Sequence, residues 1–216
     1  MKQIVRKIAK SDSAFVPIIK ASPICNIGVI DVPEDSGAKV KKKYSRTHYQ
    51  TLVNSILSQQ VSVAAADSII KKVTILNGGR ITPEKMDRLS PAKLRAAGVS
   101  GAKAKAIGEL TDAVLSRAIS FHKFPTMSNE EISLGLTNIW GIGRWTVEMF
   151  LMFHLGRLDV WPVGDLAMRR GWEKLHGLKE DIHPKELDKL GDQFAGHQSV
   201  VAWYCWRATE GESSSW

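Results

Sequence analysis

Residues 136–165 read LTNIWGIGRWTVEMFLMFHLGRLDVWPVGD, and this stretch decides the fold. A capping box made by Ser128 and Glu131, three residues later, predicts a helix that runs into it. The sequence Trp140-Gly141-Ile142-Gly143 should end that helix, and a second helix should begin near Arg144. Glycine tolerates positive φ, so two glycines allow a tight hairpin whose backbone amides point outward. Because these amides would lie at the start of the second helix, the pattern predicts a hairpin that can bind an anion.

Asp165 follows Gly143 by 22 residues and stands directly before a predicted helix. An aspartate at this position can accept hydrogen bonds from backbone amides as an N-cap. A positioned carboxylate can also stabilise positive charge that develops in a transition state. Position alone favours the cap, but one side chain can perform both roles.

The composition bounds the class of protein and of partner. The chain has 216 residues, of which 44% are hydrophobic, enough for one substantial core or two small lobes. Its formal charge is +8, with a pI near 9.5, which suits a polyanionic partner without demanding one. Two distant cysteines give no disulfide framework and no zinc or iron–sulfur spacing. We find no secretory signal, and the densest apolar run is far too short to span a bilayer, so we expect an intracellular protein with no membrane partner.

Helical signals recur along the whole chain, and strand alternation is nearly absent. Serine and threonine caps precede several of the predicted helices, at Thr47, Ser62, Thr82, Ser90 and Ser128. The sequence Ser58-Gln59-Gln60 should interrupt the helix that starts after Thr47. Helices are expected over residues 102–119, 166–175 and 186–190, the last two amphipathic. A final helix over residues 200–207 is rich in aromatic residues, and Trp206 in it is assigned to the core. The fold class predicted from these signals is all-α.

The hairpin and the following aspartate resemble those of the helix-hairpin-helix DNA glycosylases, in particular the 3-methyladenine DNA glycosylase II type. The matching positions are Leu136, Gly141, Gly143, Trp145, Thr146 and Asp165. A second stretch, residues 56–62, is similar to the segment that enters the duplex in that family. A third, residues 94–100 before Lys103 and Lys105, is similar to a helix-turn-helix between them. Together the matches cover about residues 47–207, in the family's order.

The resemblance implies two helical lobes with a DNA-binding cleft between them. One lobe would combine residues 1–46 with 165–216. The other would be the central residues 47–164, with the helix-hairpin-helix at about residues 128–155.

The resemblance also implies a chemistry. Asp165 would be the catalytic carboxylate, and one carboxylate can suffice because an alkylated purine such as 3-methyladenine is already cationic when it leaves. Family members that also cut the strand carry a lysine two residues after the second hairpin glycine. Trp145 stands there, so a monofunctional glycosylase without lyase activity is expected. Trp145, Met149 and Phe194 are the candidate base pocket.

The remaining candidate residues would contact DNA or an ion. Gly141, Gly143, Arg144 and Thr146 would bind the DNA backbone. The carbonyls of Thr137, Ile139 and Ile142 match those that can hold Na⁺ or K⁺ in relatives. Gln60 matches the wedge that fills the hole left by a flipped base. No cofactor is required by this reading.

The chain departs from the family's pattern before its last helix. Where many relatives have a Pro-Tyr-Arg group, it reads Gly196-His197-Gln198. The implied partner is double-stranded DNA containing damaged bases, and we expect a monomer located with DNA. Two alternatives stay open from sequence: a non-catalytic damaged-DNA-binding protein of the same fold, and a glycosylase for hypoxanthine or a uracil-type base.

Overall fold

The computed structural model describes residues 1–28 and 47–210. Within these residues every regular element is a helix, which confirms the predicted all-α class. None of the helices there is both long and apolar enough to cross a membrane. The chain packs as two compact units, formed in the described part by residues 1–28 with 151–210 and by residues 47–150.

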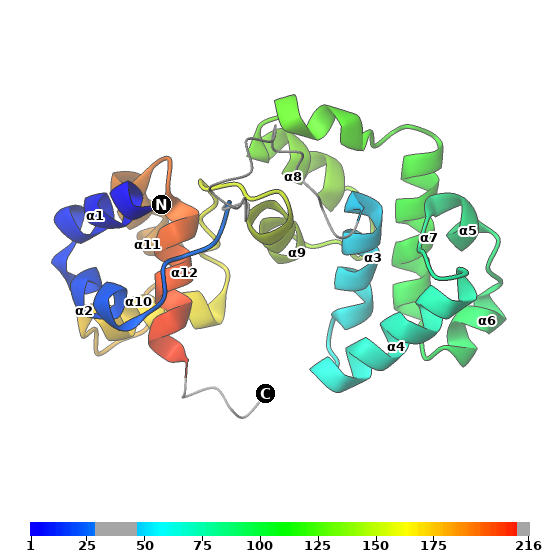
Figure 1. Ribbon diagram of the computed structural model, residues 1–216, viewed down its shortest axis with the longest axis horizontal. Coiled ribbons are helices and arrows are strands. Elements are labelled where there is room, and N and C mark those ends of the chain that lie inside the picture. Colours follow the sequence, from blue (N-terminus) through cyan, green and yellow to red (C-terminus); the bar gives the residue numbers. More distant parts are fainter. Residues whose placement is uncertain (29–46, 211–216) are drawn as a thin grey trace, which may run out of the picture. The chain divides into compact units, whose positions relative to one another are not determined.

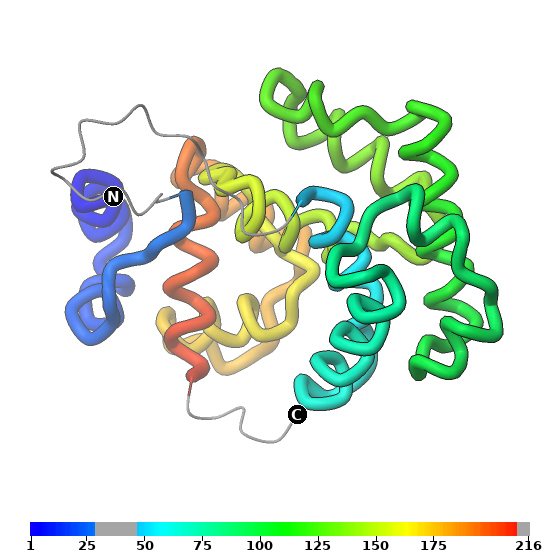
Figure 2. The backbone as a smooth tube through the Cα atoms, turned by 45° about the vertical axis from the view of Figure 1, so that its right-hand side comes forward, coloured from blue at the N-terminus to red at the C-terminus, as the bar shows by residue number. Residues whose placement is uncertain are grey.

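The unit of residues 47–150 has α7 at its centre. Helices α3, α5 and α6 pack against α7, and α4 packs against α3 (Figure 2). Its α-helices are α3 (His48–Ser58), α4 (Val63–Leu76), α5 (Pro83–Asp87), α6 (Pro91–Ala96), α7 (Gly101–Leu115), α8 (Asn129–Thr137) and α9 (Arg144–Met149). A 3₁₀ helix, Phe121–Thr126, lies between α7 and α8, and a π-helical turn, Phe150–His154, continues α9 into the other unit.

The predicted caps start these helices. The hydroxyls of Thr47, Ser62, Thr82 and Ser90 each accept the amide of the residue three positions later. Ser128 and Glu131 form the complete capping box, with each side chain bonded to the other's backbone amide. Because a cap satisfies amides that the helix leaves unpaired, these local signals set where α3, α4, α5, α6 and α8 begin.

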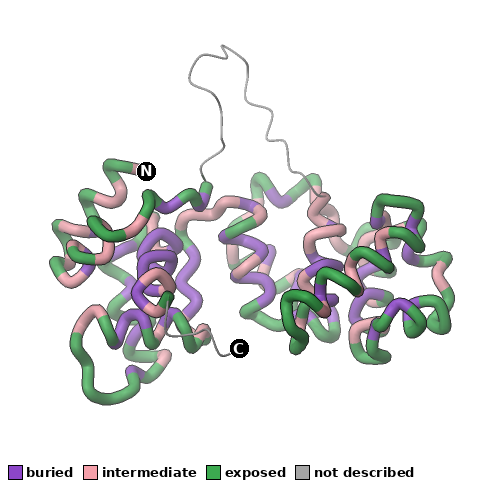
Figure 3. The backbone as a smooth tube through the Cα atoms, turned by 60° about the horizontal axis from the view of Figure 1, so that its bottom comes forward, coloured by how far each residue is buried: buried purple, intermediate pink, exposed green. Residues whose placement is uncertain are grey.

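The other unit is organised around α10 and α12, which lie side by side (Figure 1). A Cβ on Gly171 of α10 would come within 1.9 Å of the carbonyl oxygen of Cys205 on α12, so only glycine allows this approach. The helices of the unit are α1 (Lys2–Ser11), α2 (Val16–Ala21), α10 (Leu166–His176), α11 (Pro184–Gly191) and α12 (Gln198–Thr209), with 3₁₀ turns at Ser13–Phe15 and Asp192–Phe194. Buried residues, purple in Figure 3, gather in the interior of each unit.

The boundary between the units differs from the expected one. Residues 151–164 were expected in the central lobe, but they group with α10 and α12. Ser199 at the start of α12 explains this, since its hydroxyl donates to the Arg157 carbonyl at 2.9 Å and accepts the Val160 amide at 2.9 Å. The boundary therefore lies between residues 150 and 151 rather than between 164 and 165. Residues 29–46, which the expectation assigned to the terminal lobe, lie outside the described residues.

Candidate functional site

The hairpin between α8 and α9 contains two glycines with different roles. Gly141 has a φ of +84°, and a Cβ there would lie 2.6 Å from the Cβ of Ala106 on α7. Gly141 therefore permits both a left-handed backbone and the close approach of the hairpin to α7. Gly143, the N-cap of α9, has an ordinary φ of −85°, and a Cβ there would meet no atom within 4 Å. The space in front of the α9 N-terminus is consequently open at Gly143.

Backbone amides gather at this N-terminus. Within residues 1–28 and 47–210, the N–H groups of Gly141, Gly143 and Arg144 donate to no protein acceptor. Unpaired amides at the positive end of a helix favour an anion. The hairpin thus has what an anion site needs, at the positions where the sequence predicted contacts with the DNA backbone.

Arg144 adds a cation beside these amides. Its Nε lies 2.9 Å from Oε1 of Glu148, one turn along α9. The Arg144 side chain is 77% exposed, whereas that of Glu148 is 7% exposed. The pair therefore neutralises a buried carboxylate while most of the guanidinium stays in contact with solvent.

The tip of the hairpin is fastened to α7 through Trp140. Its amide donates to Oε2 of Glu109 at 3.0 Å. The ammonium of Lys105 lies 4.4 Å from the centre of the Trp140 ring and 3.9 Å from Glu109. The sequence reading did not identify these α7 contacts, because Lys105 and Glu109 are ordinary surface residues when read along the chain.

Thr146 and Gln60, two predicted DNA-contacting residues, differ in exposure. Thr146 is buried, with 5% of its surface accessible, and its Oγ1 lies 3.4 Å from Nε2 of Gln59. Gln60 is exposed just after the end of α3 and has a φ of +54°, in the left-handed region. A residue with a Cβ rarely adopts this conformation, so the wedge position is a strained point of the backbone.

The α9 members of the predicted base pocket are accessible. Trp145 is 52% exposed, and Met149, one turn later, is partly buried. The indole at position 145 is thus accessible to solvent, as a base-pocket residue must be.

The predicted cation ligands lie where α8 ends. Thr137 is the last residue of α8, and the carbonyl of Ile139 accepts the amide of Ile142 at 3.1 Å. The side chains of Ile139 and Ile142 are buried, so these residues offer only their backbone to an ion. Carbonyls at the C-terminal, negative end of a helix suit a cation, so the residues present fit Na⁺ or K⁺.

Asp165 caps α10 as one of its two predicted roles requires. The amide of Met168 donates to Asp165 Oδ1 at 2.7 Å. The indole N–H of Trp206 on α12 donates to the same oxygen at 2.9 Å. Two donors on one oxygen fix the orientation of the carboxylate, and Asp165 remains partly accessible to solvent.

Trp206 is a site residue that the sequence reading missed. The aromatic-rich final helix predicted a core position for it, yet Trp206 is only partly buried and its ring lies 5.7 Å from that of Phe153. Phe153 itself is 55% exposed. One accessible aromatic ring, that of Trp206, therefore contacts the Asp165 carboxylate, and Phe153 lies next to that ring.

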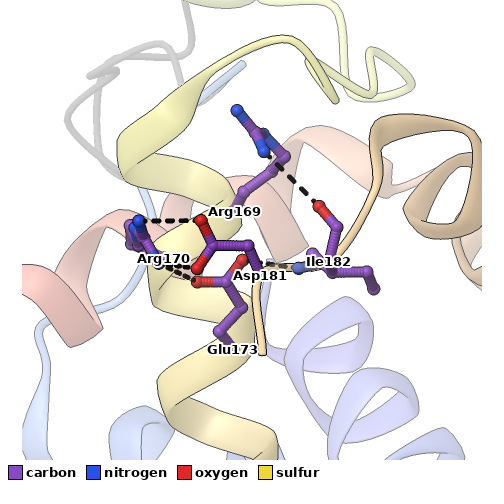
Figure 4. Close-up of polar contacts among 5 residues, drawn as sticks. All are labelled: Arg169, Arg170, Glu173, Asp181 and Ile182. Atoms are coloured by element: carbon purple, nitrogen blue, oxygen red, sulfur yellow. Dashed lines mark hydrogen bonds and ion pairs between the residues drawn. The ribbon is translucent and has the colours of Figure 1, made fainter. Parts of the chain in front are cut away.

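Ion pairs hold the second half of α10 in place. Arg170 pairs with both oxygens of Asp181 and donates to Oε2 of Glu173 at 3.1 Å (Figure 4). The other oxygen of Glu173 accepts the amide of Ile182 at 2.8 Å. The guanidinium of Arg169 does not join Arg170 on the carboxylates but donates to the carbonyl of Ile182 at 3.4 Å (Figure 4). The cluster anchors the helix whose N-cap is the candidate catalytic aspartate.

The prediction that Phe194 lines a base pocket is wrong. Phe194 is fully buried, and its ring packs edge-on against Phe15 at 5.9 Å and Trp172 at 6.2 Å. A side chain with no accessible surface cannot receive a base, so Phe194 belongs to the core of its unit. The aromatic available beside Asp165 is Trp206 instead.

The Gly196-His197-Gln198 group, where the chain departs from the family's sequence pattern, lies at the start of α12, and Trp206 lies near its end. His197 is the N-cap residue of α12, and Gly196 donates its amide to Asp159 at 2.7 Å. At 1.5 Å per residue, Gln198 and Trp206 are about 12 Å apart along the helix. The altered group therefore shapes the start of α12 and not the surroundings of Asp165.

Comparison with known proteins places these features in a family. Residues 53–195 match the family described as HhH-GPD superfamily base excision DNA repair protein. The chain is 35% identical to DNA-3-methyladenine glycosylase 1 of Schizosaccharomyces pombe over 165 residues, which are 75% of this chain and 72% of that protein. It is 32% identical to the alkylbase DNA glycosidase-like protein mag2 of the same organism, over 74% of this chain and 76% of the relative.

Solved structures agree with this grouping. A DNA-3-methyladenine glycosidase from Bacillus halodurans superposes with a TM-score of 0.81 and 33% identity, covering 99% of this chain and 92% of the other. The S. pombe 3-methyladenine DNA glycosylase Mag1, solved in complex with abasic DNA, superposes with a TM-score of 0.77 and 30% identity, covering 96% of each chain.

Proposed function

This chain belongs to the HhH-GPD superfamily of base excision DNA repair proteins, and we propose that it is a monofunctional DNA glycosylase. It hydrolyses the bond between an alkylated purine, such as 3-methyladenine, and deoxyribose in duplex DNA. Such a protein acts inside the cell, where the DNA lies. The observation that carries the proposal is the Asp165 carboxylate, oriented by the Met168 amide and the Trp206 indole and still partly accessible.

The reaction builds positive charge on the sugar as the base departs. A carboxylate held in a fixed orientation stabilises that charge without reorganising during the reaction. Glycosidases acting on neutral leaving groups need a second carboxyl group as a general acid. An alkylated purine is already cationic, so Asp165 alone can supply the carboxylate chemistry, and it can also align the attacking water.

The residue at position 145 supports hydrolysis without strand cleavage. A lysine at this position would attack the sugar and form a Schiff base, and an indole cannot. Trp145 instead presents an electron-rich face, 52% exposed, that attracts a cationic base.

DNA is held through its backbone. The amides of Gly141 and Gly143, together with Arg144 and the Thr146 hydroxyl, bind a phosphate, and Gln60 enters the stack when the damaged base flips out. The carbonyls of Thr137, Ile139 and Ile142 can hold a Na⁺ or K⁺ ion that stiffens the hairpin. If they do, DNA affinity measured at constant ionic strength will depend on which monovalent cation is present.

One experiment tests the function directly. The purified protein is incubated with methylated duplex DNA, and the released bases are separated and identified. We expect 3-methyladenine among them, with no strand cleavage. A parent protein that binds damaged DNA but releases no base would make the non-catalytic binder the better reading.

A further inference from the structure

The backbone at the end of α3 has a conformation that needs external support. Gln59 is extended, with φ −61° and ψ 134°, and the next residue, Gln60, has a φ of +54°. The left-handed region is unfavourable for a residue with a Cβ, and such a residue stays there only where its surroundings hold it. The turn at Gln60 must therefore be held by contacts from elsewhere in the fold.

Two side-chain contacts just before Gln60 supply the support. Lys103 of α7 donates its ammonium to the carbonyl of Leu57 at 2.8 Å. The Gln59 amide Nε2 donates to the carbonyl of Gly141 at 3.1 Å and approaches Oγ1 of Thr146 at 3.4 Å. The turn that presents Gln60 is thus tied to α7 before it and to the hairpin through Gln59.

The Gln59 contacts fall on two parts of the anion site. Gly141 is the left-handed glycine of the hairpin, and Thr146 carries the hydroxyl expected to bind phosphate. A hydroxyl that accepts from Gln59 keeps its own O–H proton available for another acceptor. Gln59 therefore orients the Thr146 hydroxyl as a donor while it holds the turn that precedes Gln60.

We propose that Gln59 is a positioning residue that couples the Gln60 wedge to the phosphate-binding hairpin. Binding of a backbone phosphate and insertion of the wedge then occur as one event. The proposal rests on the proposed function only in assuming that the hairpin holds DNA and that Gln60 enters the duplex. Gln59 touches neither base nor sugar, and it acts through Gln60 and Thr146.

A nearly isosteric substitution isolates the hydrogen bonds. Gln59→Met keeps the length of the side chain and removes the amide donor. The matched control is Gln193→Met, because the Gln193 Nε2 also donates to a backbone carbonyl, that of Leu190 at 3.2 Å, but this carbonyl lies only three residues away in the chain. Thermal unfolding of both variants establishes that the fold is preserved.

The assay uses a DNA duplex that already lacks the damaged base, so binding is measured without base release. It contains a stable abasic-site analogue with 2-aminopurine as the opposing base, so that displacement of that base by the wedge raises the fluorescence. Anisotropy of a second label reports the affinity. We expect Gln59→Met to lose most of the 2-aminopurine response and to bind the abasic duplex about 2- to 10-fold more weakly, the range for one or two hydrogen bonds. Gln193→Met should behave as the parent does.

A double-mutant cycle with Gln60→Ala decides whether Gln59 acts through the wedge. If it does, the double variant will match the more affected single variant, because residues acting as a unit are not additive. Effects that multiply independently, or a normal 2-aminopurine response in Gln59→Met, would overturn the proposal. Base release from methylated DNA is measured separately, so a parent that shows the coupling but releases no base would refute the proposed function and leave this inference standing.

Discussion

Replacing Asp165 by asparagine separates the charge of this side chain from its hydrogen bonding. In the parent, Oδ1 accepts the Met168 amide at 2.7 Å and the Trp206 indole N–H at 2.9 Å. The carbonyl oxygen of an asparagine can occupy the same place and accept both bonds. The amide nitrogen then replaces Oδ2, and what the substitution removes is the negative charge.

The two readings of Asp165 predict different magnitudes. Asparagine and aspartate cap helices about equally well, so the free energy of unfolding should change by less than about 1 kcal/mol. Loss of one electrostatic stabiliser of the transition state typically lowers the rate by about 10²- to 10³-fold. DNA affinity should hold or rise, because a carboxylate no longer repels phosphate.

The assay follows release of 3-methyladenine from methylated DNA under single-turnover conditions, with thermal unfolding measured in parallel. Asp159→Asn is the matched control, since Asp159 Oδ1 also accepts a backbone amide, that of Gly196 at 2.7 Å, in the same unit. Release by Asp165→Asn at the parent rate would refute the catalytic assignment. A large loss of stability together with normal activity per folded molecule would leave Asp165 as a cap alone.

Four further substitutions test the surroundings of the site. Gly143→Asp should weaken DNA binding by at least about tenfold, because it adds a negative charge where a phosphate binds. The fold should be spared, because a Cβ there meets no atom within 4 Å. Gly141→Ala should destabilise the protein by more than about 1 kcal/mol in thermal unfolding, because its φ is +84° and a Cβ there would lie too close to Ala106. Gln60→Ala should slow excision from paired DNA more than from single strands, and equal slowing on both would argue against a wedge. Trp206→Phe keeps an aromatic ring but removes the N–H that orients Asp165. Base release should therefore fall about 2- to 10-fold with an unchanged melting temperature. Release at the parent rate would show that the hydrogen bond from the Met168 amide alone orients Asp165.

The helices could be predicted because their start signals are local. Ser128 and Glu131 form a capping box within four residues of chain, and the Thr82-Pro83 and Ser90-Pro91 pairs start α5 and α6 as expected. These signals depend on the geometry of a single turn, which the sequence states directly. The unit boundary could not be read in this way, since it depends on Ser199 bonding to residues about 40 positions earlier.

Phe194 and Trp206 show why pocket residues are harder to assign than helices. Both are aromatic residues near the C-terminus, and periodicity does not say which of them is enclosed. Phe194 is covered because Phe15 and Trp172 close over it from elements far away in the chain. Trp206 keeps accessible surface, and its indole N–H finds Asp165, 41 residues earlier. These roles are set by long-range packing, of Phe15 and Trp172 on Phe194 and of Asp165 on Trp206, for which the sequence gives no local sign.

The hairpin contains both a feature that local sequence predicts and contacts that only the folded chain reveals. Gly141 can be recognised from sequence because a left-handed turn and a close approach to α7 admit hardly any other residue. The side chains that hold the hairpin are a glutamine 82 residues before Gly141 and a glutamate 31 residues before Trp140. Neither residue type is demanded by its own local backbone, so each looks like a solvated surface residue until the contact is seen. Substitutions at Gln59 and Glu109 should therefore alter DNA binding, although neither residue is among those predicted from sequence to contact DNA. The hairpin's glycines define an anion site, but the support of that site was set by the fold.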